Sequence, residues 1–135
     1  MRLLRCLIVD DDGLGRELVS LYLEGIADID IAENGRDAVE KYLSACESSI
    51  GYDIIILDII MPVMDGYEAA RTIRRHEKER GITPDKGVNI IMLSSLNTPK
   101  DVIEAYVAAQ SAAHLVKPVT EERLLKTLRK LGLVE

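Results

Sequence analysis

The run Ile54-Ile55-Ile56-Leu57-Asp58 constrains the fold of this chain more than any other feature. Four consecutive aliphatic residues are typical of a strand covered on both faces, as in a parallel sheet. The run ends at a carboxylate, and Met61-Pro62-Val63-Met64-Asp65-Gly66 then turns the chain toward a helix. Because such sheets place their chemistry beyond the carboxyl ends of their strands, we expect a reactive group at Asp58. On this segment alone, an Asp that only caps the turn explains the pattern equally well.

The rest of the chain repeats the same alternation of strand and helix. Apolar, strand-like segments cover residues 3–9, 28–32, 53–58, 88–93 and 113–116. Helical spacing of apolar residues follows each of them, at about 13–24, 35–46, 66–80, 99–107 and 120–131. This alternation predicts one doubly wound α/β domain over residues 1–135, with five parallel strands in the order 2-1-3-4-5 and five helices. The mixed charges of residues 74–80 predict a solvated helix end.

Composition excludes several classes of function. The formal net charge is −6 and no long basic stretch appears, so we expect no binding to nucleic acid. No apolar stretch approaches the roughly 20 residues of a membrane span, and no signal peptide is visible. We therefore expect a cytoplasmic protein without a membrane partner. Cys6 and Cys46 lack metal spacing and are predicted to be buried free thiols.

Polar residues follow the predicted strands and share one chemistry. The first strand ends at Asp10 and Asp11, the third at Asp58, the fourth at Ser94 and the fifth at Lys117. The first and third strands are neighbours in the order 2-1-3-4-5, so three carboxylates meet. Two charges ~5 Å apart repel by roughly 3 kcal/mol at an effective dielectric near ~20, and oxygen ligands with room for water suit Mg²⁺.

Carboxylates, a hydroxyl, an ammonium and Mg²⁺ are the groups that phosphoryl transfer needs. In this interpretation Asp58 is the nucleophile, Lys117 neutralises the phosphoryl oxygens and Ser94 donates a hydrogen bond to one of them. Each residue alone also has a structural explanation: Asp11 or Asp12 as a helix cap, Ser94 as a turn former, Lys117 as a surface lysine. The coincidence at four strand ends favours the functional interpretation.

These motifs together resemble the receiver domain of bacterial two-component response regulators. The resemblance rests on Val9-Asp10-Asp11, on Leu57-Asp58 with the segment Met61 to Gly66, on Ser94-Ser95 and on Lys117-Pro118. It runs over essentially the full chain and implies a flavodoxin-like fold. It also implies that Asp58 accepts phosphate from a histidine kinase or phosphotransfer protein.

The resemblance further implies residue roles. Asp11 and Asp58 match direct Mg²⁺ ligands, Asp10 matches a ligand acting partly through water, and Ile60 matches the position whose backbone carbonyl coordinates. Ser94 and Lys117 match the switch hydroxyl and the phosphate-binding lysine; in the family the bond before the proline that follows this lysine is commonly cis.

The switch position departs from the family pattern. His114 stands where an aromatic switch residue, Tyr or Phe, is usual, and Val119 replaces a common Phe. His114 is therefore either a pH-sensitive switch or a tolerated planar side chain. No DNA-binding or enzymatic domain follows the last helix, so we expect output through an unidentified protein that binds the surface of the fourth helix, fifth strand and fifth helix, near Tyr106, His114, Arg123 and Lys126.

Two other functions fit parts of the sequence. Val9-Asp10-Asp11-Asp12-Gly13 also fits the opening motif of haloacid-dehalogenase-type phosphatases, with Asp10 as nucleophile and Asp12 as general acid. That interpretation leaves Asp58 without a role. The third possibility is a receiver-like scaffold that binds partners without phosphorylation, which the complete set of acidic, hydroxyl and lysine residues disfavours.

Overall fold

The computed structural model describes residues 3–48, 50–59, 61, 63–83, 85–95 and 110–135. Its centre is a five-stranded parallel sheet in the order β2-β1-β3-β4-β5. The strands are β1 (Leu4–Val9), β2 (Ala27–Ala32), β3 (Ile54–Asp58), β4 (Asn89–Ser94) and β5 (Ala113–Val116). The predicted parallel sheet and its strand order are therefore confirmed.

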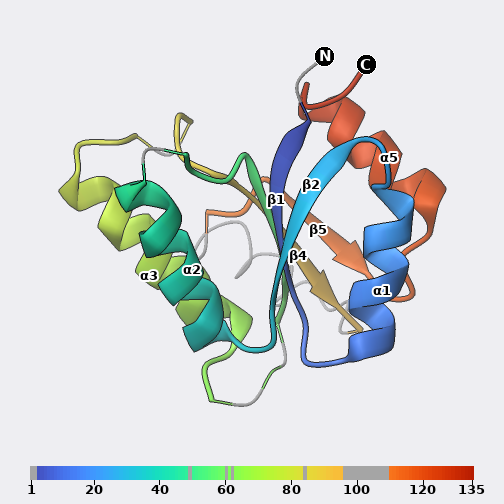
Figure 1. Ribbon diagram of the computed structural model, residues 1–135, viewed down its shortest axis with the longest axis horizontal. Coiled ribbons are helices and arrows are strands. Elements are labelled where there is room, and N and C mark those ends of the chain that lie inside the picture. Colours follow the sequence, from blue (N-terminus) through green and yellow to red (C-terminus); the bar gives the residue numbers. More distant parts are fainter. Residues whose placement is uncertain (1–2, 49, 60, 62, 84, 96–109) are drawn as a thin grey trace.

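Helices cover both faces of this sheet. They are α1 (Gly13–Tyr22), α2 (Gly35–Glu47), α3 (Gly66–Glu79) and α5 (Glu121–Lys130). Figure 1 shows α2 and α3 on one face and α1 and α5 on the other. The helix predicted to begin at Pro99 lies outside the described residues, so the described part of the chain has four helices. None of these four is both long and apolar enough to cross a membrane.

Strand β3 explains why the central run is aliphatic throughout. Ile55 and Leu57 pack into the core beneath α2 and α3, whereas Ile54 and Ile56 pack into the core beneath α1 and α5. All four side chains are buried. Burial of each one stabilises the fold by about 1.5–3 kcal/mol relative to an exposed side chain. A polar residue at any of these positions would therefore disrupt one of the two cores.

Side-chain caps set where the helices begin. Asp12, Asn34, Asp65 and Thr120 each adopt an extended backbone and accept a hydrogen bond from an amide in the first turn of the following helix. At α1 the cap is Asp12, which accepts from the amide of Leu14. Asp11 is thereby left to another role.

Two predictions about burial were wrong. Arg74 and Glu77 are only 9% and 3% exposed, although residues 74–80 were predicted to be solvated. Both continue the inward-facing spacing of Ala70 and Ile73, and each neutralises the other. Cys6 is buried as predicted, but Cys46 is only half-buried because it lies at the margin of the core beneath α2.

Candidate functional site

The acidic residues after β1 and β3 meet at the carboxyl edge of the sheet. Val9 pairs with Leu57 in register, so Asp10 and Asp58 leave the sheet side by side. Asp10 and Asp58 are 3% and 4% exposed, whereas Asp11 is exposed. One carboxylate oxygen from each of Asp10, Asp11 and Asp58 lies within 4.8 Å of the others. Three carboxylates are thus concentrated in one small volume.

Lys117 brings a positive charge to the same place. Its Nζ lies 3.1 Å from Oδ2 of Asp10 and 3.2 Å from Oδ2 of Asp58. The Lys117 amide donates to the carbonyl of Ser94 at 2.8 Å, and the bond between Lys117 and Pro118 is cis. The end of β5 is therefore tied to the end of β4, with the lysine side chain directed at the two buried carboxylates.

Burial and like charge govern the ionisation of Asp58. Burial raises the pKa of Asp58 to about 6; the Lys117 ammonium opposes this shift, and the Asp10 carboxylate adds to it. Burial alone would lower the pKa of Lys117, but the carboxylates of Asp58 and Asp10 outweigh it and raise that pKa. Asp58 is therefore ionised at neutral pH but holds its charge at a cost.

Two glycines allow the loop after β3 to close beneath Asp58. The Gly66 amide donates to the carbonyl of Ile59 at 2.8 Å, and a Cβ there would lie 2.4 Å from the carbonyl oxygen of Asp58. The Gly35 amide donates to the carbonyl of Met64 at 3.0 Å, where a Cβ would lie 2.3 Å from that oxygen. Neither position has room for a side chain, which explains the glycines of both turns.

Arg16 is a supporting residue that sequence reasoning missed. Its Nη1 donates to the backbone carbonyl of Asp10 at 2.7 Å, while the Asp12 amide donates to Oδ1 of Asp10 at 2.9 Å. These two bonds fix the turn that presents Asp10 and Asp11. The sequence does contain an indication of this role: Arg16 lies in the first turns of the helix after the acidic run. From there an arginine side chain can reach back to the loop that precedes the helix.

The acidic cluster has the composition of a cation site. Lys117 offsets one of the three negative charges of this cluster. The atoms that could coordinate a metal are all carboxylate oxygens, the ligands that hard divalent cations prefer. The residues present therefore fit a metal ion at Asp10, Asp11 and Asp58. Ile60, the fourth predicted ligand, lies outside the described residues.

The remaining predicted site residues lie along the neighbouring strands. Ser94 is buried at the end of β4 and pairs in register with Val116, next to Lys117. His114 is half-buried in β5 opposite Met92, two positions before Val116 and farther from the carboxyl edge. The structure thus groups Asp10, Asp11, Asp58 and Lys117, places Ser94 at the same edge, and sets His114 back from it.

The sequence matches the model of the response regulator receiver domain over residues 6–129. A two-component response regulator of Oryza sativa, ORR41, is 33% identical over 98% of this chain and 97% of its own length. The chemotaxis protein CheY of Bacillus subtilis is 33% identical over 93% of this chain and 95% of its own length.

Solved structures agree with this assignment. Chemotaxis protein CheY4 of Vibrio cholerae superposes with a TM-score of 0.80 at 31% identity, covering 96% of this chain and 99% of that one. The receiver domain of Ssk1 from Saccharomyces cerevisiae, solved with the histidine phosphotransfer protein Ypd1, gives a TM-score of 0.83 at 28% identity, covering 96% of this chain and 89% of that one. With its strand order and its acidic edge, this chain belongs to the response regulator receiver domain family.

Proposed function

We propose that this receiver domain accepts a phosphoryl group on Asp58 from a phosphohistidine of a histidine kinase or phosphotransfer protein, with Mg²⁺ held by Asp10, Asp11 and Asp58. The observation that carries the proposal is the position of Lys117, whose Nζ lies within 3.2 Å of both buried carboxylates. A cation aimed at a buried carboxylate beside a metal-binding cluster is the arrangement that phosphoryl transfer to that carboxylate needs.

The chain's own groups account for the chemistry of transfer. A carboxylate oxygen of Asp58 attacks the phosphorus atom, and the bond from phosphorus to the donor imidazole nitrogen breaks, with the electron pair left on that nitrogen. The Lys117 ammonium offsets the charge on the phosphoryl oxygens, and the Ser94 hydroxyl donates a hydrogen bond to one of them. A bound Mg²⁺ supplies further neutralisation of the incoming phosphate. Attack requires ionised Asp58; burial raises the pKa of this carboxyl to about 6 in the chain alone, and a divalent cation bound beside it would favour the ionised form.

The face of α1 beside the site is suited to the phosphoryl donor. Leu14, Leu18 and Leu21 are 66%, 42% and 59% exposed and recur at the spacing of one helix face. Leu14 and Leu18 also line a hollow of about 320 Å³. Asp10 and Lys117 of the acidic edge line the same hollow. An apolar surface continuous with the site suits an amphipathic helix carrying the phosphohistidine, as a phosphotransfer protein would provide. The Ypd1–Ssk1 complex shows that a related receiver pairs with such a protein.

Mass measurement of the intact protein after incubation with acetyl phosphate and Mg²⁺ tests the acceptor. We expect one phosphate-sized increment that EDTA prevents, that Asp58→Asn abolishes and that Asp12→Asn leaves in place, because Asn retains the helix cap at position 12. Turnover of acetyl phosphate that survives Asp58→Asn and fails in Asp12→Asn would support the phosphatase instead. No increment with or without Mg²⁺ would support a scaffold.

Comparison of two donors tests the docking face separately. Leu14→Gln with Leu18→Gln is expected to slow transfer from the phosphorylated cognate phosphotransfer protein by about tenfold or more, because two apolar contacts are lost and no charge is added beside the site. Labelling by acetyl phosphate should be unchanged. Ile50→Gln is the control, since Ile50 is similarly exposed but precedes the opposite end of β3. Equal effects on both donors would place the defect in the site instead of the docking face.

Output is proposed to pass through a protein bound at the surface of the predicted fourth helix, which lies outside the described residues, together with β5 and α5. Arg123 and Lys126 are exposed on α5, His114 is half-buried on β5, and Tyr106 lies outside the described residues. A pull-down with phosphorylated protein and with Asp58→Asn tests this: a partner captured only by the phosphorylated form is expected. Equal capture by both forms would contradict a phosphorylation-controlled surface.

A further inference from the structure

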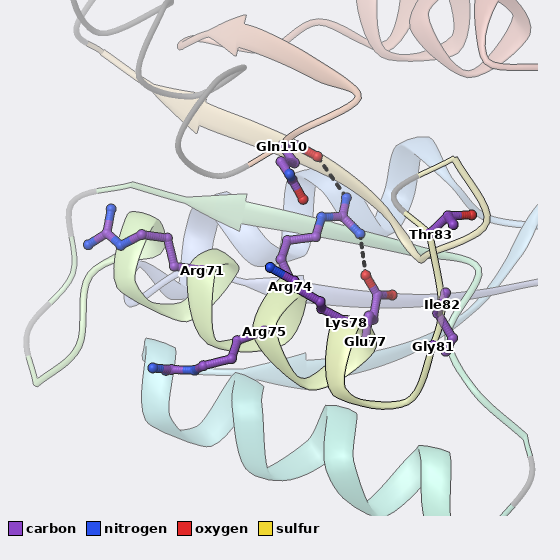
Figure 2. A pocket seen from close by; sticks show the side chains of 9 residues that line it. All are labelled: Arg71, Arg74, Arg75, Glu77, Lys78, Gly81, Ile82, Thr83 and Gln110. Carbon is purple, nitrogen blue, oxygen red and sulfur yellow. Dashed lines mark hydrogen bonds and ion pairs between the residues drawn. The ribbon is translucent and has the colours of Figure 1, made fainter.

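A second polar hollow lies against α3, away from the acidic cluster. It has a cavity volume of about 610 Å³ and is lined by Arg71, Arg74, Arg75 and Lys78 together with Glu77, the single carboxylate among the described residues that line it (Figure 2). Their net formal charge is +3, on a chain whose total is −6. A concentrated positive charge on an acidic protein needs an explanation of its own.

The inner wall of this pocket is held by a buried ion pair. Nη1 of Arg74 lies 2.7 Å from Oε1 of Glu77, and Nη2 donates to the carbonyl of Gln110 at 2.8 Å. Oε2 of Glu77 accepts from the amide of Val88 at 2.8 Å, and a Cβ on Gly87 would lie 2.3 Å from Oε1. Figure 2 shows this pair between α3 and the strands, joined to Gln110. The pair ties α3 to both flanking segments and makes the wall rigid.

The other three cations lie on the exposed side of α3, where Figure 2 shows Arg71 and Arg75 extending away from Arg74 and Gln110. Arg71, Arg75 and Lys78 are exposed and recur at the i, i+4, i+7 spacing of one helix face. None of them forms an ion pair with another described residue. The remaining acids of the helix, Glu68 and Glu79, do not line this pocket, although Glu68 lines an adjacent hollow together with Arg71 and Arg75. Like charges at this spacing destabilise a helix, and an anion bound between them would relieve that repulsion.

We propose that this pocket binds a small anion carrying two or more phosphate groups. Guanidinium groups match phosphate oxygens in a bidentate manner, and the volume falls in the ~300–1,000 Å³ range of small-molecule sites. Thr83 and Gln110 add a hydroxyl and an amide at the rim. Ile82 is the only large aliphatic residue among the described residues of the lining, so a partner helix would bury little of their apolar surface. The net charge of −6 opposes a long polyanion such as nucleic acid or an anionic membrane.

Helix stabilisation does not account for the cluster. Cations near the carboxyl end of a helix interact favourably with its dipole, and Lys78 in the last turn of α3 is placed for this. The effect fades within one turn, and Arg71 lies more than two turns from Glu79, where α3 ends. A role confined to the dipole therefore explains Lys78 and leaves Arg71 unexplained.

Calorimetric titration of the full chain with inorganic pyrophosphate and with ADP, in EDTA at low ionic strength, tests the proposal. Saturable binding at one site is expected for both probes. The double variant Arg71→Gln, Arg75→Gln should weaken it by roughly tenfold or more, because two charge-assisted contacts are lost. The matched control Arg129→Gln, Lys130→Gln removes the same charge from exposed positions on α5 and should change binding by less than about twofold, as should Lys117→Ala.

Several results would overturn the proposal. Absence of saturable binding to either probe would do so, as would equal losses in the two double variants, which would indicate general charge attraction. Loss of binding in Lys117→Ala would place the anion at the acidic edge. Tight binding of a duplex oligonucleotide with none of ADP would indicate a nucleic-acid surface instead.

The relative affinities of the two probes define the ligand further. Binding of pyrophosphate and ADP with equal affinity would show that the phosphates alone are recognised, and tighter binding of ADP would show that the nucleoside adds contacts.

Discussion

The surroundings of Asp58 disfavour its ionised form. Its side chain is buried next to Asp10, and the Lys117 ammonium is shared between the two carboxylates. The pKa of Asp58 is raised to about 6 from an ordinary value of 3.8, first by burial. A cation bound at the site would reduce this cost, because its positive charge would offset that of the carboxylates.

Stability should therefore fall as pH rises through the titration of Asp58. Between pH 3.8 and about 6 the folded chain binds more protons than the unfolded chain, so the free energy of unfolding decreases across this window. In EDTA at pH 7.5, Asp58→Asn should raise that free energy by about 1–3 kcal/mol, because each tenfold change in proton affinity corresponds to ~1.4 kcal/mol. Urea denaturation at pH 4 and at pH 7.5 measures the difference.

The control for that measurement is Asp28→Asn, an exposed carboxylate on β2. It should leave the free energy of unfolding within about 0.5 kcal/mol of the parent at both pH values. A gain in Asp58→Asn that persists undiminished at pH 4 would show that its source is not the buried charge.

Val63 carries backbone strain in the loop beneath the site. Its φ is 73°, in the left-handed region where a β-branched residue is disfavoured, and its side chain is exposed. Val63→Gly should raise the free energy of unfolding by about 1 kcal/mol, since glycine adopts this φ without a steric cost. Val63→Ala keeps a Cβ and should gain less. Thermal melts of the three proteins measure the order, and a loss of stability on Val63→Gly would contradict the strain.

Some residue placements were predictable and others were not. The carboxyl ends of parallel strands lie at one edge of the sheet, and this brings together Asp10, Asp11, Asp58 and Lys117. In the sequence, these strand ends are recognisable as apolar runs that end in polar residues. Arg74 and Glu77 were misjudged because a run of mixed charges indicates solvation by composition, while their spacing from Ala70 indicates burial. The ion pair itself depends on distances across the fold that no local pattern contains.

At the scale of elements, α3 is the helix that differs most from what the sequence predicted. Its inner face begins with small and aliphatic residues and ends with the Arg74–Glu77 pair, which contacts both the start of β4 and the segment before β5. The amphipathic pattern predicted a helix here and a polar end, and its N-cap at Asp65 agrees with the turn signal in the sequence. The buried pair adds a link between α3 and the segments that immediately precede β4 and β5.

Loss of that link should be costly. Glu77→Ala leaves Arg74 buried without its carboxylate and the Val88 amide without its acceptor, so the free energy of unfolding should fall by about 3–5 kcal/mol. Glu79→Ala, at an exposed position on the same helix, should change it by less than about 0.5 kcal/mol. Urea denaturation of both variants measures this, and equal effects would contradict the ion pair as the cause.

At the scale of the whole molecule, the strand order connects fold to function. Placing β1 next to β3 brings acidic residues from distant parts of the sequence together, and placing β4 and β5 beyond β3 adds Ser94 and Lys117 at the same edge. This order was predictable because an alternating chain with right-handed crossovers permits few topologies. The basic pocket on α3 was not, because it depends on how the loop through Thr83 and the residue Gln110 close around the helix.

Identification of the phosphorylated side chain tests the central claim most directly. An aspartyl phosphate formed from acetyl phosphate and Mg²⁺ is reduced by borohydride to homoserine, which peptide mass spectrometry locates. We expect homoserine at position 58, dependent on Mg²⁺ and absent from the sample treated with EDTA. Homoserine at position 10, or at no position while the protein remains folded, would contradict it.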